Sequence, residues 1–230
     1  MAATLPRSLV LSELRTWRPD FESALGAREP GDVVASVLDA VTTRATAIAD
    51  TVADPGALAP HMRAFTTSGV LYVAVYLALR DRGYDAARTW DVCDAATRSR
   101  FARMKGLERA AASSGLFSWP MKALSRWIAK KSKAAPVGGW AFDFVEGGGG
   151  AGDIDYGVDY TRCAIRDLAI ANGAADFAPY ICLADVAGSD TFGWGLVRTE
   201  TLAQGGARCD FRFKRGGPTD VKVRLPMAGR

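Results

Sequence analysis

The sequence predicts an α+β fold in which an N-terminal helical half packs on a small C-terminal antiparallel sheet with two helices. Three observations support it. Apolar residues recur at helical spacing through the first half, the composition changes at Ala134-Ala135-Pro136, and short alternating strands separated by glycine-rich turns follow. Runs of helices followed by runs of strands favour α+β over a doubly wound parallel sheet.

The chain has 230 residues, of which 49% are hydrophobic and 23% charged, which suits one full hydrophobic core rather than several independent domains. We expect residues 1–135 to form the helical half, within the same fold unit or as a lobe. Residues 136–216 are expected to form the antiparallel αβ half that carries the site. Residues 217–230, rich in Gly, Pro, Lys and Arg, are expected to be a loosely held tail.

Five helices are predicted in the helical half from apolar residues spaced i, i+3, i+4 and i+7 and from breakers at Pro55, Pro60 and Gly83. Their expected ranges are 31–50, 61–79, 85–103, 107–116 and 120–133. The second contains the longest uncharged stretch, 64–79. Because this is shorter than the roughly 18–20 apolar residues that cross a bilayer, we expect a buried core helix.

The second half begins with an aromatic, alternating strand at 140–146. The run of glycines at 147–150 is interpreted as a hairpin loop, because it precedes another strand and not a helix. The remaining expected elements are a strand at 154–160, a helix opened by Thr161 and closed by Asn172-Gly173, a helix opened by Pro179, and strands at 193–200 and 208–214.

The charge pattern gives no sign of a macromolecular partner. The net charge of +4 is spread along the chain, and the lysines of the helix predicted at 120–133 are interpreted as its solvated face. The N-terminal residues show no signal-peptide pattern, so the four cysteines are expected to be reduced and the protein cytoplasmic. We expect a small-molecule substrate, no nucleic acid and no membrane; no feature indicates an oligomeric state.

Most standard catalytic machinery is absent from the sequence. The single histidine excludes a multi-histidine metal site, and the cysteines do not have zinc spacing. The sequence contains no CxxC, GxSxG or GxxxxGK[ST] motif. We therefore predict neither a metal nor a cofactor.

Cys163 is the first candidate site residue. If Thr161 caps the following helix, Cys163 occupies its second position, where backbone N–H groups, the helix dipole and Arg162 would lower the pKa of the thiol. The same place equally suits a small buried apolar side chain. Both interpretations remain open from local sequence.

Three further groups have a functional and a structural interpretation. Cys182 and Asp185 share one helix face, where the carboxylate would orient water, hold an amidine-type cation or cap the helix. Cys209 alternates with two phenylalanines on a strand face, which is typical of a core. His61 opens the buried helix, as a hydrogen-bonded structural residue or a general base.

The second half also carries an ordered pattern. It consists of a cysteine after a strand, a Pro-x-x-Cys-x-x-Asp helix, an Arg-Thr-x-Thr turn and a closing Cys-Asp-Phe-Arg-Phe strand. The runs are GWAFDFVEG at 139–147, DYGVDYTRCAI at 155–165, APYICLAD at 178–185 and VRTETLAQGGARCDFRFKRG at 197–216. The pattern resembles the L-2-amino-thiazoline-4-carboxylic acid hydrolase family over residues 138–216. The helical half is similar in layout only.

The resemblance implies cofactor-independent hydrolytic opening of a cyclic amidine-like thiazoline carboxylate, giving N-carbamoyl-cysteine. A thiolate or an activated water would attack the amidine carbon and expel the ring sulfur. On this basis Cys163 is the expected nucleophile, Asp185 holds the exocyclic nitrogen or water, and His61 shuttles a proton. The expected substrate-binding residues are Cys182, Arg198, Arg212, Cys209 and Tyr160, with Arg198 or Arg212 clamping a substrate carboxylate.

One position departs from the family pattern. Where family members carry a second cysteine three residues after the first, this chain has Arg166. Two alternatives therefore stand beside the hydrolase: recruitment of the scaffold to specialised metabolism for another C–N or C–S bond reaction, and a non-catalytic small-molecule sensor. A reactive Cys163 favours an enzyme, and an inert one favours the sensor.

Overall fold

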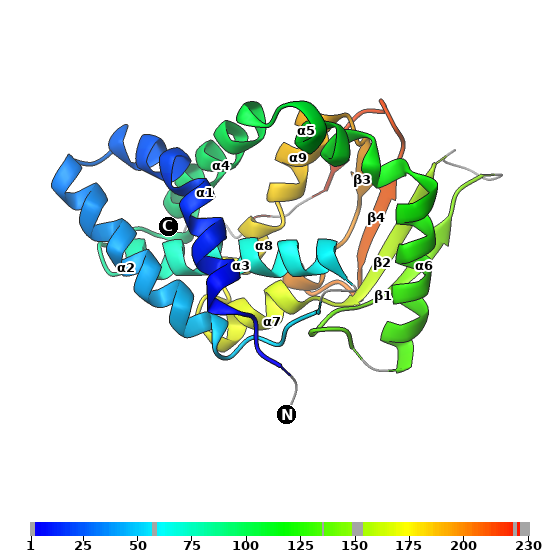
Figure 1. The fold of residues 1–230 in the computed structure, drawn as a ribbon, viewed down its shortest axis with the longest axis horizontal. Coiled ribbons are helices and arrows are strands. Elements are labelled where there is room, and N and C mark those ends of the chain that lie inside the picture. The colour runs from blue at the N-terminus through cyan, green and yellow to red at the C-terminus, as the bar shows by residue number, and fades with distance from the viewer. Residues whose placement is uncertain (1–2, 57–58, 135, 149–153, 223–224, 226–230) are drawn as a thin grey trace.

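A computed structural model describes the chain except for residues 1–2, 57–58, 135, 149–153, 223–224 and 226–230. The first helices of the chain, between residues 7 and 103, lie largely on one side of the molecule, and a five-stranded sheet lies on the other (Figure 1). The predicted α+β class is therefore confirmed. Helices from the second half pack between the two, so both halves contribute to one hydrophobic cluster that joins Val70 and Tyr76 to Leu168 and Phe177.

Four long helices build the helical half. They are α1 (Arg7–Gly26), α2 (Gly31–Ala49), α3 (Pro60–Arg80) and α4 (Ala86–Arg103). The last three agree with the predicted ranges, whereas α1 was not predicted. Its buried residues Val10, Leu14, Trp17 and Phe21 have helical spacing, but Pro19 lies within the helix and reads as a breaker in the sequence.

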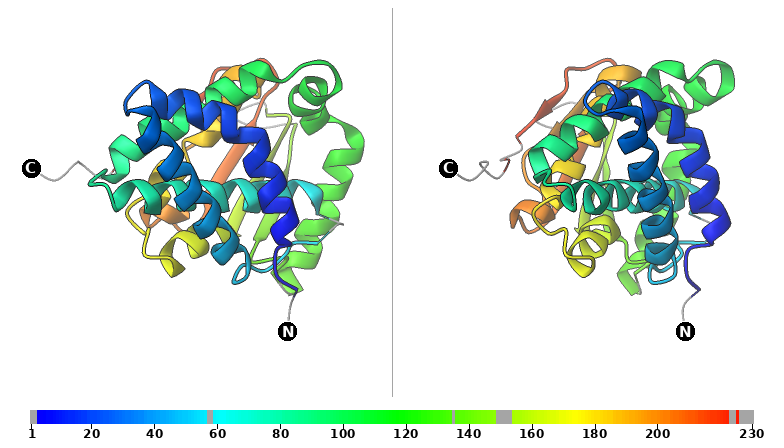
Figure 2. Two further views of the ribbon diagram at one scale, coloured as in Figure 1. Left: turned by 60° about the vertical axis from the view of Figure 1, so that its left-hand side comes forward. Right: turned by 90° about the vertical axis from the view of Figure 1, so that its left-hand side faces the viewer.

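Helix α3 runs across the middle of the molecule in both views of Figure 2. It is long and apolar enough to cross a membrane, but 78% of its most apolar window is buried inside the fold. It contacts α1, α2 and α4 and, from the second half, α7 (Ala164–Ala171). The stretch 64–79 is thus part of a core helix, as predicted.

A short helix, α5 (Gly106–Ser113), a 3-10 turn, η1 (Gly115–Phe117), and α6 (Trp119–Ala134) complete the helical half. Helix α6 lies alongside the edge strand β1 (Ala141–Glu146) (Figure 1). The Ser132 hydroxyl accepts a hydrogen bond from the Phe142 N–H at 3.1 Å and donates to the Phe142 carbonyl at 3.3 Å. The helix therefore satisfies backbone groups that an exposed sheet edge would leave unpaired.

The sheet has the strand order β1-β2-β4-β3-β5. The other strands are β2 (Tyr156–Arg162), β3 (Leu196–Arg198), β4 (Cys209–Phe213) and β5 (Asp220–Val221). The first four strands in this order pair antiparallel, but β5 pairs parallel to β3. The sheet is therefore mixed, and part of the expected loose tail extends it. The predicted hairpin loop joins β1 to β2, and its residues 149–150 lie outside the described residues.

The elements around Cys163 differ from the prediction by two residues. Strand β2 continues through Thr161 to Arg162, which pairs with Ala141, so Thr161 is not a helix cap. Cys163 itself occupies the N-cap position of α7, with φ −123° and ψ 110°. The helix predicted from Pro179 is divided into α8 (Ala178–Ile181) and α9 (Ala184–Phe192).

A close contact between α3 and α7 joins the two halves of the fold. A Cβ atom on Gly69 would lie 2.8 Å from Cγ1 of Ile165, two residues after Cys163. Ile165 packs against both the helical core and the core beside the sheet. The start of α7 is therefore fixed against the central helix.

Asp20 gives a test of how α1 is held to α4. Its side chain is 1% exposed, and its Oδ1 accepts hydrogen bonds from Ser99 Oγ at 2.7 Å and Arg103 Nε at 2.9 Å. Removing the carboxylate abolishes these hydrogen bonds, but the Arg103 side chain is 49% exposed and stays hydrated, so Asp20→Ala should lower the free energy of unfolding by about 2 kcal/mol. Urea denaturation measures this. Asp50→Ala, which removes the exposed partner of Arg7, is the control and should change stability little; equal effects would refute the argument.

Candidate active site

A cavity of about 560 Å³ lies between the helices and the sheet. Side chains from α1, α3, α4, α5, α9 and the strands line it, and many are aromatic. Among these are Phe65, Tyr72, Phe142, Tyr160, Trp194 and Phe211. Its size and apolar walls with a few polar groups are typical of a small-molecule site.

Most of the residues singled out in the sequence converge on this cavity. Those that line it are Cys163, Cys182, Cys209, Asp185, Arg198, Tyr160 and His61. Arg212 is placed elsewhere: its Nη1 donates to Asp159 Oδ1 on the neighbouring strand at 2.7 Å. Cys93 is buried in the helical core, as expected.

Cys163 is held at the start of α7, where the backbone N–H groups of Ile165 and Arg166 lie near its sulfur without forming a capping hydrogen bond. These N–H groups favour the thiolate, but burial disfavours it more strongly and raises the pKa of the Cys163 thiol to about 12. Arg162 does not compensate, because its Nε contacts Asp167 Oδ2 at 3.0 Å. The predicted lowering of the Cys163 pKa is therefore wrong for the protein without a ligand.

Asp185 and the fully buried Arg198 form an ion pair beside the cysteines. Arg198 on β3 is 1% exposed; its Nη1 donates to Asp185 Oδ2 and its Nη2 to the Cys182 carbonyl, both at 2.8 Å. Its guanidinium stacks 4.9 Å from the centre of the Phe211 ring. Its Nε is buried and has no hydrogen-bond partner among the described residues.

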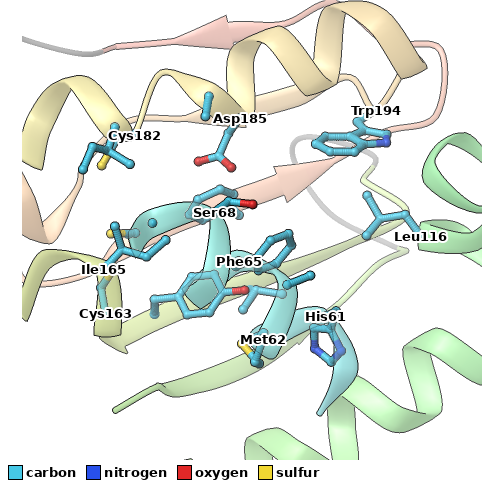
Figure 3. A pocket seen from close by; sticks show the side chains of 18 of the residues that line it. His61, Met62, Phe65, Ser68, Leu116, Cys163, Ile165, Cys182, Asp185 and Trp194 are labelled. Atoms are coloured by element: carbon cyan, nitrogen blue, oxygen red, sulfur yellow. The ribbon is translucent and has the colours of Figure 1, made fainter. Parts of the chain in front are cut away.

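The Asp185 carboxylate is accessible only in part, with 38% of the side-chain surface exposed, and it points into the cavity (Figure 3). Burial raises the pKa of Asp185, and the neighbouring Arg198 guanidinium offsets only part of the rise. The carboxylate therefore exchanges a proton nearer neutral pH than an exposed aspartate does. Such a group is suited to bind an amidinium cation or to act as an acid or base.

Cys182 and Cys209 complete the polar end of the cavity. Burial raises the pKa of both thiols, while Arg198 lowers it. Cys163, Cys182 and Cys209 all line this cavity, and the negative charge of Asp185 also raises the pKa of each thiol. All four cysteines are free, and within the described part of the chain no three His, Cys, Asp or Glu residues are arranged to hold a metal ion.

His61 lies in the first turn of α3 and faces the cavity from the side opposite Cys163 and Cys182 (Figure 3). Both imidazole nitrogens are buried without a hydrogen-bond partner among the described residues, and the ring packs edge-on against Phe65. Burial lowers the pKa of His61, so the imidazole is neutral at pH 7. The imidazole nitrogens can therefore form hydrogen bonds with a ligand in the cavity rather than with the Cys163 thiol.

Apart from His61, sequence reasoning missed the part of the wall that α3 provides. Phe65, Ser68 and Tyr72 follow His61 at helical spacing and line the cavity with it, a pattern that was present in the sequence. No pattern in the sequence indicated that Trp194 lines the cavity. Its position depends on Gly188, where a Cβ atom would lie 2.5 Å from the indole ring.

The comparisons with known proteins identify one family. A model of the L-2-amino-thiazoline-4-carboxylic acid hydrolase family matches residues 64–213, which contain every cavity residue from the second half discussed above. Searches of curated proteins and of solved structures found no match.

The raised pKa of Cys163 predicts slow alkylation at neutral pH. With iodoacetamide at pH 8, Cys163 in the folded protein should react at least about 100-fold more slowly than in the unfolded chain, because the thiolate is the nucleophile. The rate should keep rising as the pH increases to 10. Mass spectrometry of the peptide containing Cys163 measures both. A rate that levels off below pH 8 would show a stabilised thiolate and contradict the prediction.

Proposed function

The chain belongs to the L-2-amino-thiazoline-4-carboxylic acid hydrolase family, and we propose that it opens the ring of a thiazoline-type cyclic amidine by hydrolysis. One observation carries the proposal within the site. Cys163, a thiol at the start of α7, faces the same cavity as the Asp185–Arg198 ion pair. A sulfur nucleophile and an anion for the amidine nitrogens are the groups that the reaction needs.

We propose that binding of the substrate activates the thiol. Asp185 would hold the exocyclic nitrogen of the neutral amidine. The thiol proton passes to the amidine ring nitrogen, which leaves a thiolate beside the electrophilic carbon. The positive charge of the amidinium formed in this way would offset the desolvation that raises the Cys163 pKa. The two N–H groups at the start of α7 stabilise this thiolate.

The covalent route then has two steps. The Cys163 sulfur bonds to the amidine carbon, the bond from that carbon to the ring sulfur breaks, and the ring sulfur leaves and takes up a proton. Water, deprotonated by Asp185, attacks the same carbon and releases the Cys163 thiol, so that a carbamoyl group and a free thiol form by net addition of one water. Direct attack by water activated at Asp185 gives the same product. Neither route needs a redox cofactor.

The remaining site residues have supporting roles in the proposal. Both terminal nitrogens of Arg198 are engaged, so we propose that Arg198 orients Asp185 instead of clamping a carboxylate. Cys182, Cys209 and Tyr160 shape the cavity around the reacting carbon. Arg212 has no role, because it contacts Asp159.

His61 would exchange a proton with the substrate from the opposite side of the cavity, directly or through a water molecule. The four free cysteines support a reducing compartment, for which we propose the cytoplasm, and the cavity supports a small molecule as the partner.

A second function is favoured by one observation. The raised pKa of Cys163 describes an unreactive thiol, which suits a protein that binds a small molecule without turning it over. Turnover of a cyclic amidine separates the two functions.

Removing the nucleophile tests the covalent route. The protein is incubated with L-2-amino-thiazoline-4-carboxylate, and ring loss and N-carbamoyl-cysteine are followed by mass spectrometry. Cys163→Ala should lower kcat by at least about 1,000-fold. Cys93→Ala, which removes a thiol from the helical core, should keep the wild-type rate. Substantial turnover by Cys163→Ala would replace the covalent route with direct attack by water, and no turnover by the wild type would favour the binding protein.

Removing the charge of Asp185 tests its role in proton transfer. Asp185→Asn should lower kcat by about 100-fold. In the wild type, kcat/KM should fall as the pH drops through the raised pKa of Asp185, at a higher pH than an ordinary aspartate near 3.9 would give. That acidic limb should disappear in Asp185→Asn. Asp190→Asn, on the exposed side of the same helix, is the control. An unchanged acidic limb would refute the assignment.

A further inference from the structure

Two arginines around the start of α7 share the carboxylate of Asp167. Arg162 donates from Nε to Asp167 Oδ2 at 3.0 Å, and Arg166 donates from Nη1 to Asp167 Oδ1 at 3.3 Å. The second contact is longer than a typical charge-assisted hydrogen bond. Because one carboxylate serves two guanidinium groups, the cluster carries an uncompensated positive charge. Of its three side chains, only that of Arg166 lines the cavity.

The guanidinium of Arg166 retains donors for a ligand. Among the described residues, Asp167 is the one hydrogen-bond partner of this side chain, and the contact uses Nη1. The side chain is 39% exposed, so it is accessible rather than enclosed in the core. A guanidinium presents a planar fork of N–H donors, and those on Nη2 and Nε of Arg166 have no acceptor in the described part of the chain. Such a fork matches the two oxygens of a carboxylate.

The other arginines of the described lining are less suited to an anionic group. Both terminal nitrogens of Arg198 are engaged, and a carboxylate placed there would also lie beside that of Asp185. Arg100 pairs with Glu108, and Glu13 lines the same cavity. The part of the lining from α1, α4 and α5 therefore has two carboxylates for one arginine, and their charges disfavour a further anion.

Arg166 also lies close enough to Cys163 for one small substrate to contact both. Cys163 is the N-cap of α7 and Arg166 its third residue, positions whose side chains lie on the same side of a first helical turn. The backbone N–H of Arg166 lies near the Cys163 sulfur. In a thiazoline-4-carboxylate, three bonds of about 1.5 Å each join the amidine carbon to the carboxylate carbon, so the two are within roughly 4.5 Å. An amidine carbon at the sulfur thus brings the carboxylate within reach of Arg166.

Resting on the proposed function, we propose that Arg166 binds the carboxylate of the substrate and thereby selects cyclic amidines that carry a carboxyl group. The guanidinium would hold the carboxylate oxygens on the α7 side of the cavity, and Asp185 would hold the exocyclic nitrogen on the α9 side (Figure 3). A ring held at both ends would present its amidine carbon to Cys163 in one orientation.

The first arm of the test compares two compounds that differ in one charge. L-2-Amino-thiazoline-4-carboxylate and its primary amide have nearly the same shape, but only the acid has a carboxylate. Isothermal titration calorimetry with Cys163→Ala measures Kd without turnover, and kcat/KM is measured on proteins that retain Cys163. The acid should bind at least about tenfold more tightly than the amide, because the amide cannot form charge-assisted hydrogen bonds with Arg166.

The second arm changes Arg166. Arg166→Gln removes the charge and should raise the Kd of the acid about 10- to 100-fold, while the Kd of the amide changes by less than about threefold. Arg166→Lys retains the positive charge without the planar fork and should bind the acid more tightly than Arg166→Gln does. The matched control is Arg162→Gln, which removes the other partner of Asp167 outside the cavity lining and should change either Kd by less than about twofold.

The outcomes separate this inference from the proposed hydrolysis. Equal binding of acid and amide would overturn the inference, as would an equal loss of both compounds in Arg166→Gln or an equal loss of the acid in Arg162→Gln. If Arg166→Gln hydrolyses the acid with the wild-type kcat/KM, the hydrolysis stands and the inference falls. If the acid binds through Arg166 but the wild type does not hydrolyse it, the inference stands and the proposed hydrolysis falls. Failure of the protein to bind either compound would overturn both.

Discussion

The buried guanidinium of Arg198 is the constraint on which the polar end of the cavity depends. Because Arg198 is 1% exposed, its charge requires an anion and hydrogen-bond acceptors close by. The Asp185 carboxylate and the Cys182 carbonyl supply them. The three groups come from β3, from the first turn of α9 and from the end of α8. The pair thus brings three elements together and aims the free oxygen of Asp185 into the cavity (Figure 3).

The contact between α3 and α7 fixes the other reactive group. Because Gly69 has no side chain, Ile165 lies directly against the central helix, and Ile165 is the second residue of α7. Cys163 precedes this anchored turn by one residue and takes its position from it. The thiol and the carboxylate are therefore held by separate contacts, one to the helical core and one across the sheet, and neither depends on a flexible loop.

The sequence predicted an element correctly where apolar residues follow one clear pattern along it. The apolar run of α3 and the alternating residues of β1 appear at the expected places, whereas α1 was missed because Pro19 interrupts its pattern. Most of the candidate residues lie around one cavity, but the burial and the charges around them could not be predicted from the sequence. Arg162 was expected to lower the pKa of Cys163, but its guanidinium contacts Asp167, and burial by distant elements dominates. The spacing of residues along the chain does not show how deeply elements that are distant in the sequence will bury a thiol.

The high pKa of Cys163 is consistent with catalysis once the charge of the ligand is considered. A thiol that stays neutral in the protein alone resists oxidation and unspecific alkylation, since both require the thiolate. In the proposed mechanism, an amidinium in the cavity would add a positive charge next to the Cys163 sulfur, so that thiolate and substrate cation would stabilise each other in a site with little water. The desolvation that suppresses the free thiol would then strengthen this ion pair. Under this proposal reactivity is confined to the complex with a cationic amidine, and the same burial would account for both the inert thiol and the proposed nucleophile.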